Sequence, residues 1–242
     1  TNQDSFMLSR MNTYAGEAAM AVVCDGMGGL SRGELASAQV VRAFDSWFLT
    51  DFPKHVQNGL ERDELFQDWN KIIQDKNREL LQFGKRENVS LGTTVDAILI
   101  MEGLYYIAHV GDTRVYEIKP DGIRCLTKDH SLVMREVELG HLAPEDMERD
   151  PRRNILLQCI GAEGGVRPDF YCGNGMSGKV FLICCDGFRH EIRNDEIFAK
   201  LNPRAIHNRG IMQENLQSLV DLCLDRGERD NVTAVGIYVD SL

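Results

Sequence analysis

Residues 20–29, MAVVCDGMGG, join a short apolar run to an Asp-Gly pair, and residues 180–187, VFLICCDG, repeat the pattern. Short apolar runs that stop at such turn residues predict buried β-strands. A bare carboxylate is costly beside a buried strand, so Asp25 and Asp186 need either a turn-capping role or a bound cation. These two segments therefore predict both the core of the fold and the position of its chemistry.

Further strands and separated helices surround these two runs. Two hairpins are expected, each closed by a glycine-containing turn: residues 94–101 with 104–110, and residues 115–118 with 123–126. A last strand is expected at 233–239, and helical spacing predicts helices starting at Ser31, over about 63–83 and over about 213–225. Glu34 would complete a capping box with Ser31. Hairpins together with separated helices favour an α+β fold.

Composition excludes several classes of protein. The 242 residues are 43% hydrophobic and 26% charged, which is typical of a globular chain and excludes wholesale disorder. No apolar stretch approaches the roughly 20 residues of a membrane span, and a net charge of −10 disfavours a nucleic-acid partner. Seven cysteines without a C-x-x-C pair, and no visible signal peptide, predict a reducing compartment, the cytoplasm.

Aspartates cluster at the ends of predicted strands. Asp25, Asp186 and Asp230 each lie at a strand edge, and Asp4 and Asp112 have similar settings. Taken singly, each is more often a turn residue. Together they favour a site for a hard cation, since oxygen ligands suit Mg²⁺ or Mn²⁺ rather than zinc.

Seven ordered sequence blocks carry a resemblance to a known family: Asn2-Gln3-Asp4-Ser5, residues 22–29 (VVCDGMGG), Gly92-Thr93-Thr94, residues 110–114 (VGDTR), residues 126–131 (LTKDHS), residues 183–187 (ICCDG) and residues 230–233 (DNVT). The chain resembles the PPM (type 2C) metal-dependent serine/threonine protein phosphatases, most closely their bacterial branch. The resemblance implies a four-layer αββα sandwich of two antiparallel β-sheets flanked by helices. It also implies a single domain, residues 1–242, with a flap at about 127–170.

The resemblance further implies a site for two Mn²⁺ or Mg²⁺ ions with a bridging hydroxide that attacks phosphorus. Asp25 matches the residue that bridges both ions, and the carbonyl of Gly26 matches a ligand of one. Asp186 and Asp230 match the ligands that complete the shell of the other ion. Asp4 matches a residue that orients metal-bound water.

The sequence departs from the family pattern near the expected third ion. Asp112 matches a ligand of that ion, but His190 occupies a position where an Asp often helps to bind it. Gln3 stands where the family often has Glu, and the arginine that grips substrate phosphate would fall before Thr1. His130 is interpreted as a structural hydrogen-bonding residue. The charged run in the flap is interpreted as a solvated face: Glu145, Asp146, Glu148, Arg149 and Asp150.

Two functions of different classes follow. The first is an Mn²⁺/Mg²⁺-dependent phosphatase, a monomer acting on phosphoserine and phosphothreonine in proteins and opposing a serine/threonine kinase. The alternative is a catalytically weak or inactive phosphatase-fold domain that acts as a regulatory phosphoprotein-binding module. Gln3 and His190 favour the alternative. The complete set of Asp25, Asp186 and Asp230 argues against it, because binding alone does not require acids at three strand ends.

Overall fold

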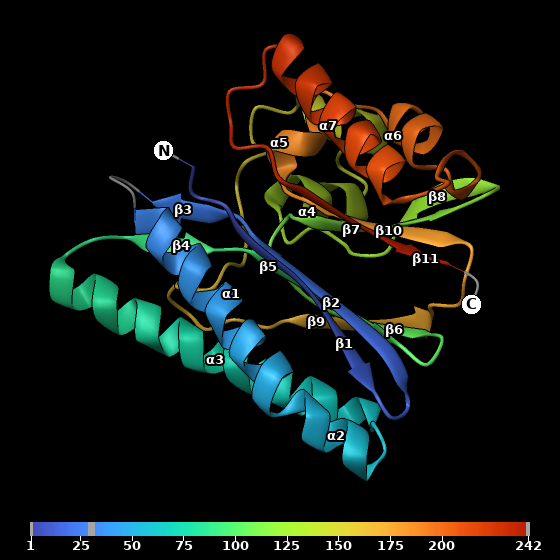
Figure 1. The fold of residues 1–242 in the computed structure, drawn as a ribbon. Helices are drawn as coiled ribbons and strands as arrows, with labels where there is room; N and C mark the ends of the chain where they lie inside the picture. The colour runs from blue at the N-terminus through green and yellow to red at the C-terminus, as the bar shows by residue number, and fades with distance from the viewer. Residues whose placement is uncertain (1, 29–31, 241–242) are drawn as a thin grey trace.

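The computed structural model describes residues 2–28 and 32–240, and two antiparallel β-sheets lie at its centre (Figure 1). The first sheet contains, in spatial order, β1 (Ser5–Thr13), β2 (Gly16–Cys24), β5 (Val95–Met101), β6 (Leu104–Val110) and β9 (Asp169–Asn174). The second contains β11 (Ala234–Val239), β10 (Lys179–Cys184), β7 (Arg114–Lys119) and β8 (Gly122–Cys125). A short ladder pairs β3 (Gly26–Gly28) with β4 (Leu91–Thr93).

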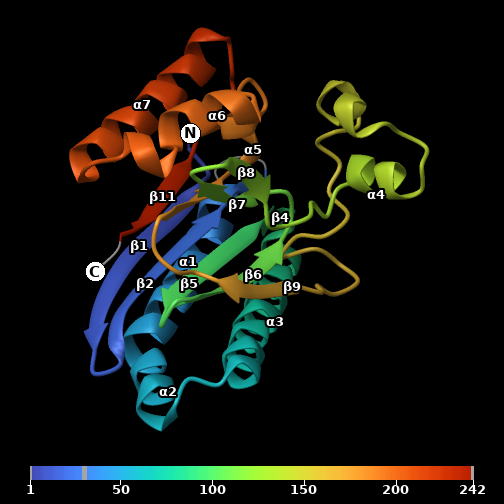
Figure 2. The ribbon, with the colours of Figure 1, turned by 90° about the vertical axis from the view of Figure 1, so that its right-hand side faces the viewer.

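Helices form the two outer layers (Figures 1 and 2). The first sheet is covered by α1 (Arg32–Thr50), α2 (Phe52–Asn58) and α3 (Arg62–Glu87). The second is covered by α6 (Asn194–Leu201) and α7 (Arg209–Asp225), with the short helices α5 (Asp186–Arg189) and η2 (Pro203–Ala205) beside them. The predicted four-layer αββα sandwich is confirmed. No helix in the described ranges has both the length and the apolar content needed to cross a bilayer.

The central strands are apolar on both faces because each lies between two layers. In β2, Met20 and Val22 pack toward the helices, whereas Ala21 and Val23 pack toward the second sheet. This alternation follows from the two-residue period of a strand. It explains why the run that precedes Asp25 is continuously apolar rather than alternating with polar residues.

Some predicted boundaries were wrong. β1 and β9 were not predicted, because both are half-exposed strands without a continuous apolar run. The second helix was predicted to stop at Gly84, but α3 continues to Glu87, and Asn88 ends it at a φ of 53°. Gly84 instead allows the close approach of Val89, whose carbonyl oxygen would lie 2.7 Å from a Cβ at position 84. The predicted cap at Ser31 lies outside the described residues.

The flap, residues 127–170, contains α4 (Leu132–Glu138) and the 3₁₀ helix η1 (Pro144–Arg149). Figure 2 shows α4 projecting beside the two sheets. Only the last two residues of the flap belong to a sheet, since β9 begins at Asp169. The flap returns to the core at Ile160, which exchanges two backbone hydrogen bonds of 2.9 Å with Thr93. The next residue, Thr94, accepts a hydrogen bond from the N–H of Asp25.

A buried ion cluster on the second sheet gives a testable stability prediction. Glu117 accepts a hydrogen bond from Arg124 at 2.7 Å and lies 2.9 Å from the ammonium of Lys179. Burial alone would raise the pKa of Glu117, but the hydrogen bonds of Lys179 and Arg124 outweigh it and lower the pKa. Glu117→Gln is therefore expected to cost about 1 kcal/mol at pH 7. Urea unfolding measures this cost.

The pH dependence gives the sign of the same effect. A lowered carboxyl pKa stabilises the protein above the unfolded value of about 4.3 and ceases to do so as the pH falls through the folded pKa. The difference between wild type and Glu117→Gln should therefore vanish in acid. Asp121→Asn, an exposed change in the adjacent turn, is the control. A difference that persists unchanged at low pH would contradict the assignment.

Candidate active site

The carboxyl end of β2 is packed tightly against the amino end of the chain. A Cβ at Gly26 would lie 2.3 Å from the carbonyl oxygen of Gly33 and 2.4 Å from that of Gln3. The side-chain amide of Gln3 donates to the carbonyl of Gly28 at 3.0 Å, and its backbone N–H donates to Asn231 Oδ1 at 2.7 Å. Three segments distant in sequence are thereby joined around Gly26. Gln3 uses its N–H₂ group here, which a glutamate lacks.

The main chain of Asp25 is held on both sides by two threonines. Its N–H donates to Thr94 Oγ1 at 2.9 Å, and its carbonyl accepts from Thr94 N at 2.9 Å and from Thr93 Oγ1 at 2.8 Å. Burial raises the pKa of Asp25 to about 10, and the neighbouring acids, Asp4 first among them, add to the shift. The carboxyl group therefore lies in a desolvated, electronegative environment.

Asp4 and Asp186 have buried carboxylate oxygens that find no hydrogen-bond partner among the described residues. Asp4 Oδ2 accepts from Thr233 Oγ1 at 2.6 Å, whereas Asp4 Oδ1 is unpartnered. Burial raises the pKa of Asp4 despite that hydrogen bond. Asp186, the first residue of α5, is 8% exposed, and its Oδ1 is also unpartnered. Burying a carboxylate oxygen without a hydrogen-bond partner costs free energy unless a water or a cation binds to it.

Asp230 reaches the same region through a close approach between two turns. A Cβ at Gly187 would lie 2.2 Å from the carbonyl oxygen of Asn231 and 3.3 Å from the Cβ of Asp230. Asp230 Oδ1 accepts from the N–H of Asn231 at 2.7 Å, so this carboxylate also caps its turn. The structure thus brings the Asp-Gly pair after β10 beside the Asp-Asn pair before β11, as glycine at 187 permits.

The predicted acids are neighbours, but they do not form a closed cage. Within residues 2–28 and 32–240, no group of three or more His, Cys, Asp or Glu side chains has the geometry of a metal-ion site. Like charges repel in a desolvated region, so the carboxylates can lie close together without pointing at a common position. The donor set nevertheless fits a hard divalent cation, since Asp4 and Asp186 have unpartnered carboxylate oxygens and both acids are close enough to Asp25 to raise its pKa.

Asp112 is placed differently from the other predicted acids. It is 5% exposed, and Arg189 Nη2 lies 3.7 Å from its Oδ2 and donates to its carbonyl oxygen at 3.3 Å. Burial raises the pKa of Asp112 to about 7, and the Arg189 guanidinium opposes that rise. His190 lies between two other acids: Nε2 is 3.6 Å from Asp186 Oδ2 and Nδ1 is 3.4 Å from Glu228 Oε2. A third ion at Asp112 stays a prediction.

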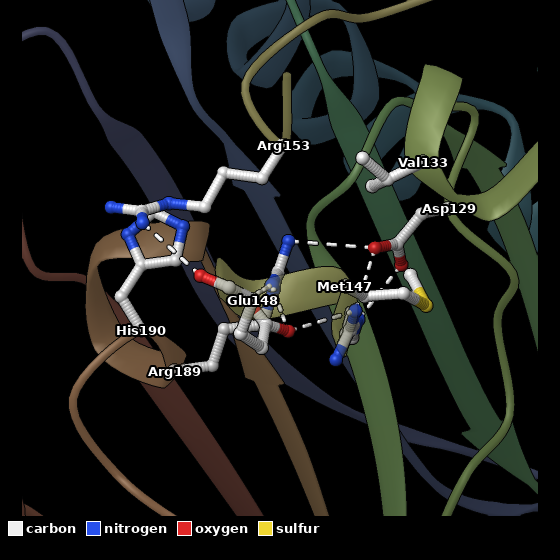
Figure 3. Close-up of a pocket in the computed structure, with 8 residues that line it drawn as sticks. Asp129, Val133, Met147, Glu148, Arg153, Arg189 and His190 are labelled. Atoms are coloured by element: carbon white, nitrogen blue, oxygen red, sulfur yellow. Dashed lines mark hydrogen bonds and ion pairs between the residues drawn. The ribbon is translucent and has the colours of Figure 1, made fainter. Parts of the chain in front are cut away.

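A second charged cluster borders this region and was missed in the sequence (Figure 3). Arg114 makes two hydrogen bonds to the carboxylate of Asp129, at 2.8 and 2.7 Å. Arg189 Nη1 lies 2.9 and 3.1 Å from the two carboxylate oxygens of Glu148 in the flap. Glu145, Asp146 and Arg149 are exposed, as the interpretation of a solvated face requires, whereas the half-exposed Glu148 also pairs with Arg189, which was not predicted. The sequence around Arg189, DGFRH at residues 186–190, gave no local signal for this pairing.

Two histidines anchor the beginning of the flap. His130, predicted to be structural, accepts from the N–H of Gly111 at 3.2 Å and lies 3.3 Å from Asp169. His109 was missed: its ring nitrogens lie 2.8 Å from Asp96 Oδ1 and 2.9 Å from the carbonyl oxygen of Lys128. Both rings thus connect the first sheet to the flap through local polar groups, as the structural interpretation requires.

Comparison with known proteins identifies the family. The sequence pattern described as "Protein phosphatase 2C" matches residues 1–221. The chain is 31% identical over 228 residues to protein phosphatase PhpP of Streptococcus pneumoniae, covering 92% of this chain and 87% of that protein.

Solved structures agree with this assignment. The serine/threonine phosphatase of S. agalactiae has a TM-score of 0.85 at 29% identity, covering 99% of this chain and 94% of that one. The catalytic domain of the phosphatase PstP, in complex with two manganese ions, shares the fold with a TM-score of 0.74 at 23% identity, covering 98% and 99%. The chain belongs to the protein phosphatase 2C family and is an enzyme of the bacterial serine/threonine phosphatase type.

Proposed function

We propose that this chain hydrolyses phosphoserine and phosphothreonine in proteins with two Mn²⁺ or Mg²⁺ ions held by Asp25, Gly26, Asp186 and Asp230. One observation carries the proposal: Asp4 and Asp186 each have a buried, unpartnered carboxylate oxygen, and both acids are close enough to Asp25 to raise its pKa. Such a donor set suits a hard divalent cation. The two ions of the structural relative PstP make Mn²⁺ the first ion to test.

The chain's own residues would position the reactants. Two such ions would lower the pKa of a bound water and neutralise charge on phosphoryl oxygens. Asp25 is the residue suited to contact both, because the hydrogen bonds of Thr93 and Thr94 fix its main chain. Thr233 holds Oδ2 of Asp4, which leaves Oδ1 to accept a hydrogen bond from the attacking water. Gly26 offers its carbonyl where no side chain would fit.

The proposal extends to partners and compartment. The substrates would be phosphoproteins, and a serine/threonine kinase would supply them, since the reaction consumes what such a kinase makes. The enzyme would act as a monomer in the cytoplasm. Support for a reducing compartment comes from the cysteines, since all seven are free thiols. Burial raises the pKa values of Cys24 and Cys185, which keeps these two protonated and unreactive.

The direct test is phosphate release from a phosphothreonine peptide with millimolar Mn²⁺. We expect EDTA to abolish release and Asp186→Asn to lower kcat/KM by about 100-fold or more, because one ion loses a charged ligand. Asp195→Asn, an exposed change on α6, is the matched control and should stay within about twofold. Tight binding of the phosphopeptide without turnover would instead support the regulatory binding module and overturn the proposal.

A further inference from the structure

Arg189 is a buried arginine surrounded by acids. The residue is 8% exposed, and its guanidinium lies against Glu148 and Asp129 (Figure 3) and also against Asp112. Nη1 contacts both oxygens of Glu148 at 2.9 and 3.1 Å, while Nη2 lies 3.4 Å from Asp129 Oδ2 and 3.7 Å from Asp112 Oδ2. An arginine stays charged in a protein, so this site contains a fixed positive charge.

The neighbouring charges show which acids depend on Arg189. Asp129 already receives two short hydrogen bonds from Arg114, at 2.8 and 2.7 Å. Arg114 is 3.4 Å from Glu148, a much longer contact than those of Arg189. Asp112 is 3.7 Å from Arg189, and Arg114 lowers its pKa less than Arg189 does. Arg189 is therefore the cation that Asp112 and Glu148 share, one acid from the predicted metal region and one from the flap.

A planar guanidinium is suited to this double contact. Its five N–H groups fan out in fixed directions and can serve several acceptors at once. A divalent ion at Asp112 would need several oxygen ligands and would stand close to the guanidinium, where like charges repel. The adjacent residue, His190, presents an imidazole toward Asp186 and Glu228 and adds no carboxylate. The residues around Asp112 thus fit an internal cation better than a third metal ion.

We infer that Arg189 is a built-in cation that neutralises Asp112 in place of a third metal ion and docks the flap through Glu148. Arg189 would act as a positioning residue, through Asp112 and Glu148. The part that concerns metal stoichiometry rests on the proposed function, whereas the docking of the flap does not. Because Arg189 contacts both Asp112 and Glu148, it would couple the edge of the active site to the flap.

Metal stoichiometry tests the first part. Equilibrium dialysis against Mn²⁺ should give two ions per chain for wild type and two for Asp112→Asn, because Asp112 holds no ion. Arg189→Lys should also retain two, since lysine keeps the charge. Three ions in wild type, falling to two in Asp112→Asn, would overturn the inference while leaving the two-ion site intact. No bound Mn²⁺ in wild type would instead refute the proposed function.

Hydrogen exchange in metal-free protein tests the second part independently. Glu148→Ala is expected to speed exchange of the amide of Asp150, which closes η1 onto Asp146 and Met147, by about tenfold or more. The control is Glu145→Ala, an exposed residue of the same 3₁₀ helix, which should leave that rate within about twofold. Arg189→Lys should resemble Glu148→Ala, because an ammonium cannot hold both acids as the guanidinium does. Unchanged exchange in Glu148→Ala would overturn the docking role.

Discussion

Asp25→Asn is expected to lower phosphatase activity by about 100-fold or more and to stabilise the metal-free protein. The activity falls because one carboxylate is proposed to serve both ions, so an amide there weakens two sites at once. The stability rises because Asp25 is a desolvated acid among other acids, which raises its pKa to about 10 and penalises its ionised form. With this pKa, Asp25 is protonated at pH 7 in the metal-free protein, so folding requires the uptake of a proton, which costs about 1 kcal/mol or more and which an amide does not need.

Two measurements on the same sample separate these effects. Steady-state kcat/KM on a phosphothreonine peptide gives the activity, and thermal melts with and without Mn²⁺ give the stability. Wild type should gain melting temperature on adding Mn²⁺, whereas Asp25→Asn should start higher and gain little. Asp221→Asn, an exposed acid on α7, should behave as wild type. Retention of more than a few per cent of turnover, or an undiminished Mn²⁺ shift, would remove Asp25 from its proposed role.

Gly26→Ala is expected to lower the free energy of unfolding by about 3 kcal/mol, together with most of the activity. The new methyl group would lie 2.3 and 2.4 Å from two main-chain oxygens, of Gly33 and Gln3. Overpacking costs about 1–3 kcal/mol, and backbone atoms held by the hydrogen bonds of Gln3 can yield little. Separation of these segments would also displace the Gly26 carbonyl and the adjacent Asp25.

Urea unfolding and the phosphate assay check this substitution. The matched control is Gly122→Ala in the β7–β8 hairpin, where a Cβ meets nothing within 4 Å. The backbone of Gly122 does not have a positive φ, so alanine there should change the free energy of unfolding by less than about 0.5 kcal/mol. If the two alanine variants were equally stable and equally active, the close packing of residues 3, 26 and 33 would not be what positions the site.

The strongest sequence predictions were those in which one physical requirement left few alternatives. The runs before Asp25 and Asp186 predicted buried strands, and they are apolar on both faces because they lie between two layers. The sandwich of two sheets itself was implied by the family resemblance. Residues that end such strands necessarily lie at a sheet edge. The proximity of Asp186 and Asp230, in contrast, depends on the close approach of the Asn231 carbonyl to Gly187, which leaves no room for a Cβ. The order of the motifs implied this tertiary contact only through the family resemblance.

The missed features are those that depend on partners distant in sequence. β1 is a half-exposed edge strand, and its polar alternation resembles that of a loop until β2 pairs with it. Glu148 lies in a run of charges, and only the fold shows that this one also pairs with Arg189. The ring of His109 is likewise explained by Asp96 across a strand pair. Local pattern carries no information about such long-range charge pairing.

Anomalous X-ray scattering at the manganese absorption edge, from crystals soaked in MnCl₂, tests the central claim most directly. Two strong peaks are predicted, both beside the Asp25 carboxylate, one also near the Gly26 carbonyl and the other flanked by Asp186 and Asp230. No peak is predicted between Asp112 and Arg189. Absence of manganese beside Asp25 in crystals of enzyme that hydrolyses the phosphopeptide would contradict the account.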